Sequence, residues 1–294
     1  MLLTTIFCET DDFCKNFQKQ FKVNLLSNGD SRRNRSFSMT LSEIMAIIIF
    51  FPYSGYKTFK DYYEKHVMVN MKADFPGLVS YTRFLELKQK CFFALLIFAT
   101  SRCGKCTGIS FIDSFSLEVC HIKREHSNKV FQNFAKKGMT SMGWFFGFKL
   151  HLMINHLGEI IGFFITPGNV ADNNENVLMK LTKKVFGKLF GDKGYLINSE
   201  LFEKLYNNGV QLITKLRKNM KNKLMLMKDK ILLGMRRLIE TVGGLLKEQL
   251  SLEHTRHRSK IGFFVHIFSV ILAYSFREHK PSIGAKPIAL PKFC

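Results

Sequence analysis

The chain has 294 residues, of which 46% are hydrophobic, so it can bury a sizeable core and an intrinsically disordered chain is excluded. Lys and Arg number 44 against 23 Asp and Glu, and the resulting net charge of +21 favours a polyanionic partner such as nucleic acid over a merely solvated cationic surface. The sequence shows no signal peptide, and its longest apolar run, at 261–276, is shorter than the roughly 20 residues of a membrane span. We therefore expect a reduced, cytoplasmic setting, a buried helix at 261–276 and no membrane partner.

The first hundred residues are predicted to be helical. Hydrophobic side chains recur at helical spacing between Ile6 and Phe21. A polar break follows at Ser27–Ser38, and it carries Arg32, Arg33 and Arg35. Helices beside a basic loop are typical of a DNA-binding module, although any small helical bundle would show the same pattern.

Capping signals divide the rest of this helical region. Thr40 and Glu43 form a candidate capping box for a helix that Pro52 ends. Thr58 and Ser80 are the N-cap candidates of two further helices. The three predicted helices cover residues 41–51, 59–69 and 80–98.

The pattern changes to strands near Gly108. Apolar side chains alternate between Ile109 and Leu117, as in a strand with one buried face. The predicted strands cover residues 109–117, 144–154, 159–166, 188–191 and 210–216, and the predicted helices cover residues 172–186, 199–207 and 238–250. Three antiparallel strands followed by helix, strand, helix, strand and helix predict an α/β fold with a ribonuclease-H-like mixed sheet.

Three carboxylates in this region are candidate catalytic groups. Asp113 lies on an apolar strand face, where a carboxylate is costly unless it is paired or bound to metal. Asp192 follows a short apolar strand, at the strand end where open α/β sheets place their sites. Glu240 shares a helix face with Arg236 and Lys247. Taken singly, each has a structural alternative: a strand-end salt bridge, a turn residue and a solvated ion-pair face respectively.

Taken together, the three carboxylates predict a metal site. Carboxylates from two strands and a helix can converge to supply the hard oxygen ligands of Mg²⁺ or Mn²⁺, and we expect two ions. One ion would activate water or a 3′ hydroxyl group while the other stabilises the leaving oxygen. Arg236 and Lys247 are then expected to hold phosphates. A zinc site at Cys103 and Cys106 is disfavoured because no second Cys pair has zinc-ligand spacing.

Ordered motifs along nearly the whole chain, to about Pro281, resemble bacterial insertion-sequence transposases, most closely the insertion sequence 982 family. The motifs cover residues 54–63, 111–114, 140–151, 166–170, 190–195, 212–221, 239–242 and 254–259. The resemblance implies an acidic-triad (DDE) transposase that cleaves DNA and transfers strands, with Asp113, Asp192 and Glu240 as its triad. Related transposases carry Tyr, Arg, Glu and Lys through the last helix, and this chain has Leu233 at the Tyr position.

Three parts are predicted along the chain: a helical region for DNA end recognition at 1–105, the catalytic domain at 106–280, and a tail at 281–294 outside the resemblance. The expected partners are double-stranded DNA, as element ends and as target, and further copies of the chain in a homo-oligomer on DNA, within the nucleoid of a bacterial cytoplasm. The basic residues expected on DNA, besides those of the last helix, are Arg32, Arg33, Arg35, Lys136, Lys137, Lys215, Arg217, Lys218 and Lys221.

Two alternatives stay open. One is a ribonuclease-H-like nuclease that cuts without joining strands, and the other is a DNA-binding remnant whose active site has decayed. Gly243 and Gly244 inside the predicted catalytic helix favour decay, because two glycines cost roughly 2 kcal/mol against two alanines. Gly234 and Met235, where basic residues are expected, favour it too, whereas the intact triad favours catalysis.

Overall fold

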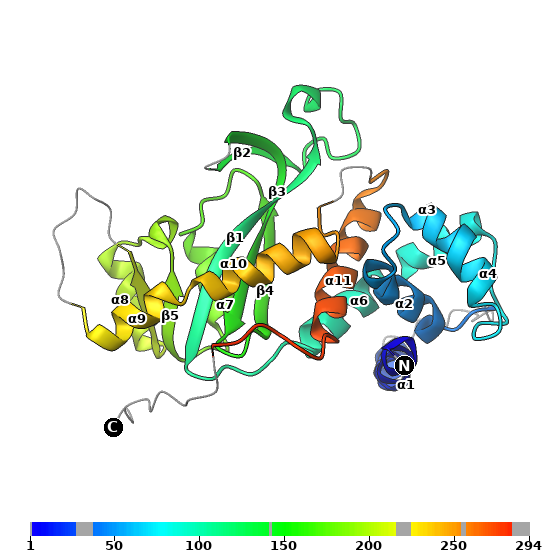
Figure 1. Ribbon diagram of the computed structural model, residues 1–294, viewed down its shortest axis with the longest axis horizontal. Coiled ribbons are helices and arrows are strands. Elements are labelled where there is room, and N and C mark those ends of the chain that lie inside the picture. Colours follow the sequence, from blue (N-terminus) through cyan, green and yellow to red (C-terminus); the bar gives the residue numbers. More distant parts are fainter. Residues whose placement is uncertain (1, 28–37, 141–142, 216–224, 254–256, 284–294) are drawn as a thin grey trace. The chain divides into compact units, whose positions relative to one another are not determined.

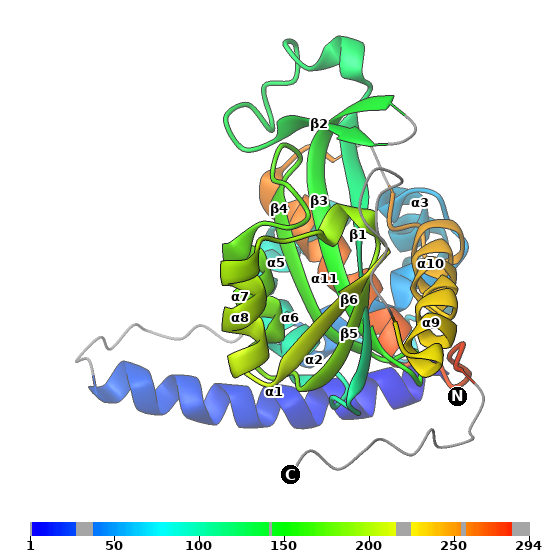
Figure 2. The same cartoon turned by 90° about the vertical axis from the view of Figure 1, so that its left-hand side faces the viewer.

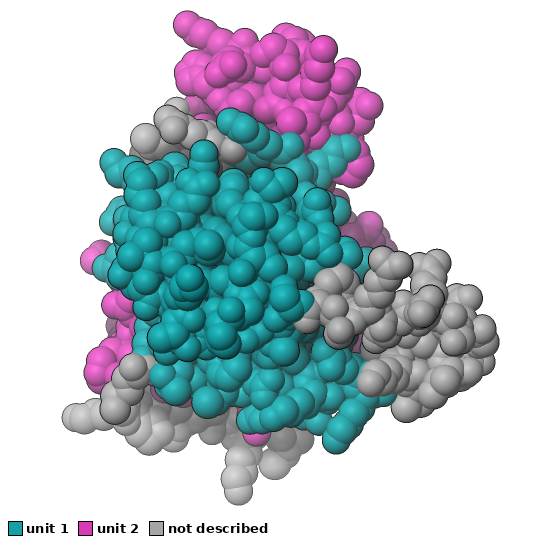
Figure 3. Space-filling model, turned by 90° about the vertical axis from the view of Figure 1, so that its right-hand side faces the viewer, with its two compact units in different colours: residues 1–102, 248–252, 257–276 teal, residues 103–247, 253–256, 277–294 magenta. Residues whose placement is uncertain are grey.

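A computed structural model of the protein describes residues 2–27, 38–140, 143–215, 225–253 and 257–283. The chain forms two compact units, coloured separately in Figure 3. The first unit contains residues 1–102, 248–252 and 257–276, and the second contains residues 103–247, 253–256 and 277–294. The predicted division into an end-recognition region at 1–105 and a catalytic domain at 106–280 concerns function and stays a prediction. By packing, residues 257–276 belong to the first unit.

The regular elements described in the first unit are helices. They are α1 (Leu2–Ser27), α2 (Leu41–Phe50), α3 (Phe59–Tyr62), α4 (Met68–Asn70), α5 (Tyr81–Lys90), α6 (Phe92–Ser101) and α11 (Lys260–Ser275). A 3-10 turn at Phe51–Tyr53 follows α2, and a π turn at Tyr63–Val67 joins α3 to α4. The long helix predicted from Ser80 is interrupted at Cys91, so that α5 and α6 are separate.

The predicted caps are present in the structure. The Thr40 backbone N–H donates to Glu43 Oε2 at 2.6 Å, and the Glu43 N–H donates back to Thr40 Oγ1 at 3.2 Å, which completes the capping box of α2. Thr58 accepts a hydrogen bond from the Asp61 N–H at 3.1 Å and caps α3. These caps satisfy backbone donors that have no partner inside their helices, so they specify where each helix begins.

The apolar run at 261–276 forms α11, which is buried as predicted. Its side chains pack against α2, α5 and α6 within the first unit. His266 is also buried there, and its Nε2 lies 2.8 Å from the carbonyl oxygen of Ser251. Among the described residues, no helix is long and apolar enough to cross a membrane.

The second unit contains a six-stranded mixed sheet (Figures 1 and 2). Its strands are β1 (Ile109–Cys120), β2 (Lys136–Thr140), β3 (Gly143–Asn155), β4 (Ile160–Pro167), β5 (Gly187–Gly191) and β6 (Val210–Thr214). β1, β3 and β4 are antiparallel neighbours, and β5 and β6 run parallel to β1. The mixed α/β class is therefore confirmed, and β2, which pairs with the first residues of β3, is an additional strand that the sequence pattern did not predict.

Four helices of the second unit are described: α7 (Glu175–Thr182), α8 (Ser199–Asn207), α9 (Met227–Gly234) and α10 (Arg237–Gly244). The helix predicted from Asp172 begins later, because the side chain of Asn174 accepts the Val177 N–H at 3.3 Å and caps α7. Asp172 is left in the preceding loop. A π turn at Leu245–Gln249 follows α10, so the single helix predicted there is shorter than expected.

The two faces of β1 pack against different helices. Ile112 belongs to a core with residues of α7 and α8, including Leu178 and Leu201. The alternate residues on β1 face the other way, toward α10, where the Phe115 ring meets Gly243. Figure 2 shows α7 and α8 on one side of the sheet and α9 and α10 on the other. Asp113 therefore lies on the α10 side.

Candidate active site

Asp113 and Asp192 come from neighbouring parallel strands. In the β1–β5 ladder Phe111 pairs with Phe190, and each Asp lies two residues further along its own strand direction. Side chains at matching positions of paired strands share a face of the sheet, so the ladder directs both carboxylates toward the same face, with Asp192 one residue beyond the end of β5. The negative charge of Asp192 is one of the causes that raise the pKa of Asp113, so the two carboxylates influence each other.

Arg236 joins Asp113 to Glu240. Its Nη1 lies 2.9 Å from Asp113 Oδ2, and its Nη2 lies 2.6 Å from Glu240 Oε1. The guanidinium side chain is only 15% exposed, whereas Glu240 is 53% exposed. One turn of α10 separates Arg236 and Glu240, and the close packing of α10 on β1 brings Asp113 within reach of both.

Burial dominates the electrostatics of Asp113. It raises the pKa of this carboxyl group from 3.8 to about 6, against the opposing effects of Arg236 and of the Ser114 N–H, which donates to Asp113 Oδ1 at 2.9 Å. A carboxylate that is costly to ionise and lies beside a second carboxylate is stabilised by a positive charge. Arg236 supplies that charge here, and a divalent cation would supply more of it.

The carboxylates of this site fit a metal ion in their chemistry but form no complete ligand set as they stand. Among the described residues, no three His, Cys, Asp or Glu side chains lie close enough together to hold one. Asp113 and Asp192 offer hard oxygen ligands of the kind that Mg²⁺ and Mn²⁺ prefer. Glu240 is held by Arg236 instead, so it would have to exchange this ion pair for the metal.

Asp172 is a further acidic residue at this site. A Cβ atom placed on Gly194 would lie 3.0 Å from Asp192 Oδ1 and 3.3 Å from Asp172 Oδ2, so both carboxylates border the same glycine. Asp172 also pairs with Lys149 of β3, whose Nζ lies 3.0 Å from Asp172 Oδ1. Sequence reasoning missed Asp172 as a site residue, although it lies two residues after the Thr166–Val170 motif. It was instead predicted to begin a helix.

Two fully buried polar side chains lie beneath these acids, on the α7 side of the sheet. His151 Nε2 bonds to Thr166 Oγ1 at 2.9 Å, and its Nδ1 has no hydrogen-bond partner among the described residues. The Tyr195 hydroxyl interacts with Ser114, but it forms no hydrogen bond of ordinary geometry within the described structure. Burial, followed by the charges of Asp172, Asp113 and Asp192, raises the pKa of Tyr195.

The predicted DNA-binding residues that the structure describes all belong to the second unit. Lys136 and Lys137 are exposed on β2, and Lys215 is exposed directly after β6. Lys247 is half-buried and pairs with Glu253 at 2.5 Å, while Arg236 pairs with the two acids described above. The remaining six, Arg32, Arg33, Arg35, Arg217, Lys218 and Lys221, lie outside the residues that the structure describes. Binding of DNA by any of these residues stays a prediction.

Comparison with known families identifies the second unit. The family model described as "Transposase DDE domain" matches residues 103–260, which is more than half of the chain. The chain belongs to this transposase DDE family. The match includes β1, β5 and α10, so Asp113, Asp192 and Glu240 all lie inside it. None of the curated proteins matches the sequence.

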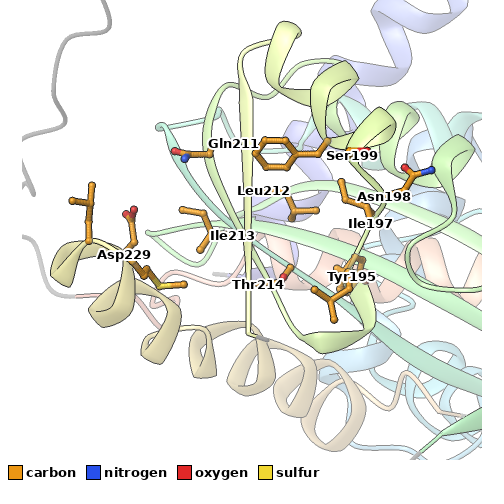
Figure 4. Close-up of a pocket in the computed structure, with 13 residues that line it drawn as sticks. Tyr195, Ile197, Asn198, Ser199, Gln211, Leu212, Ile213, Thr214 and Asp229 are labelled. Atoms are coloured by element: carbon orange, nitrogen blue, oxygen red, sulfur yellow. The ribbon is translucent and has the colours of Figure 1, made fainter. Parts of the chain in front are cut away.

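A pocket of about 520 Å³ lies at the β6 edge of the transposase DDE domain (Figure 4). Its lining comes from β6, from the segment leading into α8 and from α9. The Asp229 carboxylate in this lining pairs with Lys188 Nζ at 2.5 Å, and both side chains are nearly buried. Neither Asp113 nor Asp192 lines the pocket, so it is separate from the acidic site.

Proposed function

We propose that the protein is a metal-dependent DNA transposase that cleaves phosphodiester bonds and transfers strands, with Asp113, Asp192 and Glu240 as its catalytic triad. One observation carries the proposal: within the region of the family match, Asp113 on β1 and Asp192 directly after β5 follow neighbouring parallel strands, and Arg236 joins Glu240 to Asp113. Mg²⁺ or Mn²⁺, as two ions, is the proposed cofactor.

The sheet supports a ribonuclease-H-like architecture for this domain. β4 and β2 pair with successive parts of the same edge of β3, so the strands follow the order β4-β3-β1-β5-β6. The first three are antiparallel and the last two are parallel to β1, in agreement with the order of elements expected from the sequence. This topology brings the ends of two nonconsecutive strands together, as a site at a strand crossover requires.

The residues of the chain have separate roles in the proposed reaction. When bound, divalent ions would supply the activation of water or a 3′ hydroxyl group and the stabilisation of the leaving oxygen. Asp113, Asp192 and Glu240 would hold the cation, and Glu240 would have to give up its ion pair with Arg236 to do so. The guanidinium group of Arg236, which also donates to Asp113, would then have free donors for a phosphate. Asp113 stays fixed through its bond from the Ser114 N–H.

The test is a cleavage assay with purified protein, DNA and Mg²⁺ or Mn²⁺ but no nucleotide cofactor. We expect Asp113→Asn to abolish cleavage and to leave DNA affinity nearly unchanged, because the carboxylate serves the metal rather than the DNA. The matched control is Asp74→Asn, which changes an exposed acid of the first unit and should cleave normally. Undiminished cleavage by Asp113→Asn would refute the mechanism.

The same assay separates the alternatives. Joined products in addition to cut ones identify a transposase, whereas cutting alone identifies a ribonuclease-H-like nuclease. An inactive wild-type protein that still binds DNA identifies a decayed remnant. The packing of Gly243 against Phe115 removes part of the argument for decay, because a side chain at this position would clash. Gly244, with open space around it, keeps its cost to the helix, and Gly234 and Met235 still differ from the basic residues expected there.

The finer assignments belong to the same proposal. They are membership of the insertion sequence 982 family, recognition of element ends by the helical region at 1–105, and a homo-oligomer on double-stranded DNA in the bacterial nucleoid. The excess of basic residues over acidic residues supports a DNA partner, because it concentrates polyanions near the protein. Ordered motifs shared with insertion-sequence transposases support the family assignment.

A further inference from the structure

We propose that the ribbon formed by β2 and residues 143–147 of β3, called here the β2–β3 ribbon, is a binding site for an unpaired DNA base, with Trp144 as the stacking platform. Figures 1 and 2 show β2 at one end of the sheet. The proposal deepens the proposed function, because it takes DNA as the substrate and specifies the state of that DNA which the ribbon recognises.

Trp144 is the single tryptophan of the chain, and 57% of it is exposed. Its antiparallel partner on β2 is Met139, which is 64% exposed. Directly paired residues share a face of a sheet, so the two large apolar side chains stand next to each other in solvent. An exposed Trp beside a second exposed apolar side chain is unusual on a monomer surface and marks a binding position.

A positive charge lies next to the indole ring, in a basic segment of the chain. Lys137 belongs to the same face of β2 as Met139, and its Nζ lies 5.7 Å from the centre of the Trp144 ring. Residues 121–140, which lead from β1 through β2, contain five Lys and Arg but one acid, Glu125. All five basic residues are exposed: Lys123, Arg124, Lys129, Lys136 and Lys137. This charge complements a polyanion and argues against a basic or a neutral apolar partner.

The ribbon and the catalytic acids share a face of the sheet. Asp113 pairs with Leu152 on β3, and Trp144 lies eight residues before Leu152, an even number. Trp144 therefore belongs to the same face as Asp113, about 27 Å away along the strand at the usual rise of ~3.4 Å per residue. This corresponds to about eight nucleotide steps at ~3.4 Å per step, so one DNA strand can reach both sites.

The aromatic ring favours an unpaired base over a closed duplex. Lysines alone would suffice to hold a phosphate backbone, and in a duplex the base faces are already stacked on each other. An indole gains most from a base whose face is free, and every base offers such a face regardless of sequence. Single-stranded or locally opened DNA is the substrate state that presents one.

The single tryptophan gives a direct readout. We expect the fluorescence of Trp144 in the full-length protein to be quenched by a single-stranded oligonucleotide and by a duplex with one unpaired base. A fully paired duplex of the same sequence should quench it less at equal occupancy. Occupancy is measured separately, by the anisotropy of labelled DNA, without metal so that no cleavage interferes.

Variants distinguish stacking from charge. Trp144→Ala should weaken single-strand binding by between about 5-fold and 150-fold, whereas Trp144→Phe keeps a ring and should recover part of the loss. Met139→Ala removes the neighbouring apolar side chain and should have little effect. Lys137→Ala should lower the slope of log affinity against log salt by about 0.7, while Trp144→Ala should leave that slope unchanged.

Unchanged fluorescence at saturating DNA, or equal affinity of Trp144→Ala and wild type, would overturn the proposal. So would a fluorescence change that follows protein concentration rather than DNA, since it would assign the ribbon to contacts between copies of the chain. Because the readout is binding, a protein that fails the cleavage test but binds through Trp144 separates the failure of the proposed function from the failure of this site.

Discussion

At the scale of single residues, the buried polar groups beneath the acidic site set how the protein responds to pH. His151 is fully buried, and burial lowers its pKa from 6.5 to about 4. The unfolded chain therefore takes up a proton at this position before the folded protein does. Asp113 has the opposite shift, so the folded protein binds its proton first as the pH falls toward 6.

We expect the free energy of unfolding to gain a contribution from His151 that is complete above pH ~6.5 and is lost as the pH falls to ~4, by about 3 kcal/mol in total. His151→Gln, which can still bond to Thr166, should lack this loss. The measurement is urea unfolding of both proteins across this pH range without divalent metal. The contribution of Asp113 is the same in both proteins, so it cancels in the difference between their free energies of unfolding. The control is His279→Gln, an exposed histidine, which should follow wild type.

At the scale of elements, α10 packs directly on the Phe115 ring of β1 at Gly243, which has no side chain. A Cβ atom at this position would lie 2.1 Å from Cε1 of the Phe115 ring, whereas a Cβ atom on Gly244 would meet nothing within 4 Å. The approach of α10 brings Arg236 within hydrogen-bond distance of Asp113. Gly243 is therefore needed for packing, whereas Gly244 only lowers the stability of the helix.

The two glycines should respond oppositely to alanine. Gly243→Ala is expected to lower the free energy of unfolding by about 1–3 kcal/mol through overpacking. Gly244→Ala is expected to raise it by up to ~1 kcal/mol through helix propensity. Denaturant unfolding of both variants measures this. Adding Phe115→Leu should recover part of the Gly243→Ala loss, and equal effects of the two alanines would contradict the close contact.

At the scale of the whole molecule, the first unit is built from both parts of the chain. α11 follows the transposase DDE domain in sequence, but its buried side chains pack on α2, α5 and α6 of the first unit. A cut near residue 103 therefore does not release the second unit alone. It also removes the partners of one of the most apolar helices of the chain.

A fragment of residues 103–294 is expected to aggregate or to bind hydrophobic dye, because the buried face of α11 loses its cover. A fragment of residues 103–253, which lacks α11, should be better behaved. Size-exclusion chromatography and dye binding of the two fragments against the full chain measure the difference. If the longer fragment is monomeric and binds no dye, α11 does not depend on the helices before residue 103.

The sequence by itself determined the elements whose signals are local. Strand alternation around Asp113, the caps at Thr40 and Thr58, and helix α8 at its predicted bounds depend on neighbours within a few residues. Such features are readable because alternation, caps and turns are chemically encoded at short range. The DDE family assignment was also available from ordered motifs, and the family match confirms it.

Only the tertiary structure decided the contacts between distant residues. Arg236 reaches Asp113 across 123 residues of sequence, where the pattern had suggested a phosphate contact. Asp172 lies in a loop beside Gly194 rather than in a helix. Gly243 leaves room for the ring of Phe115, which lies on β1, far from α10 in the sequence. These positions depend on how closely two elements approach each other, which is set by the packing of all the side chains between them and by no local pattern.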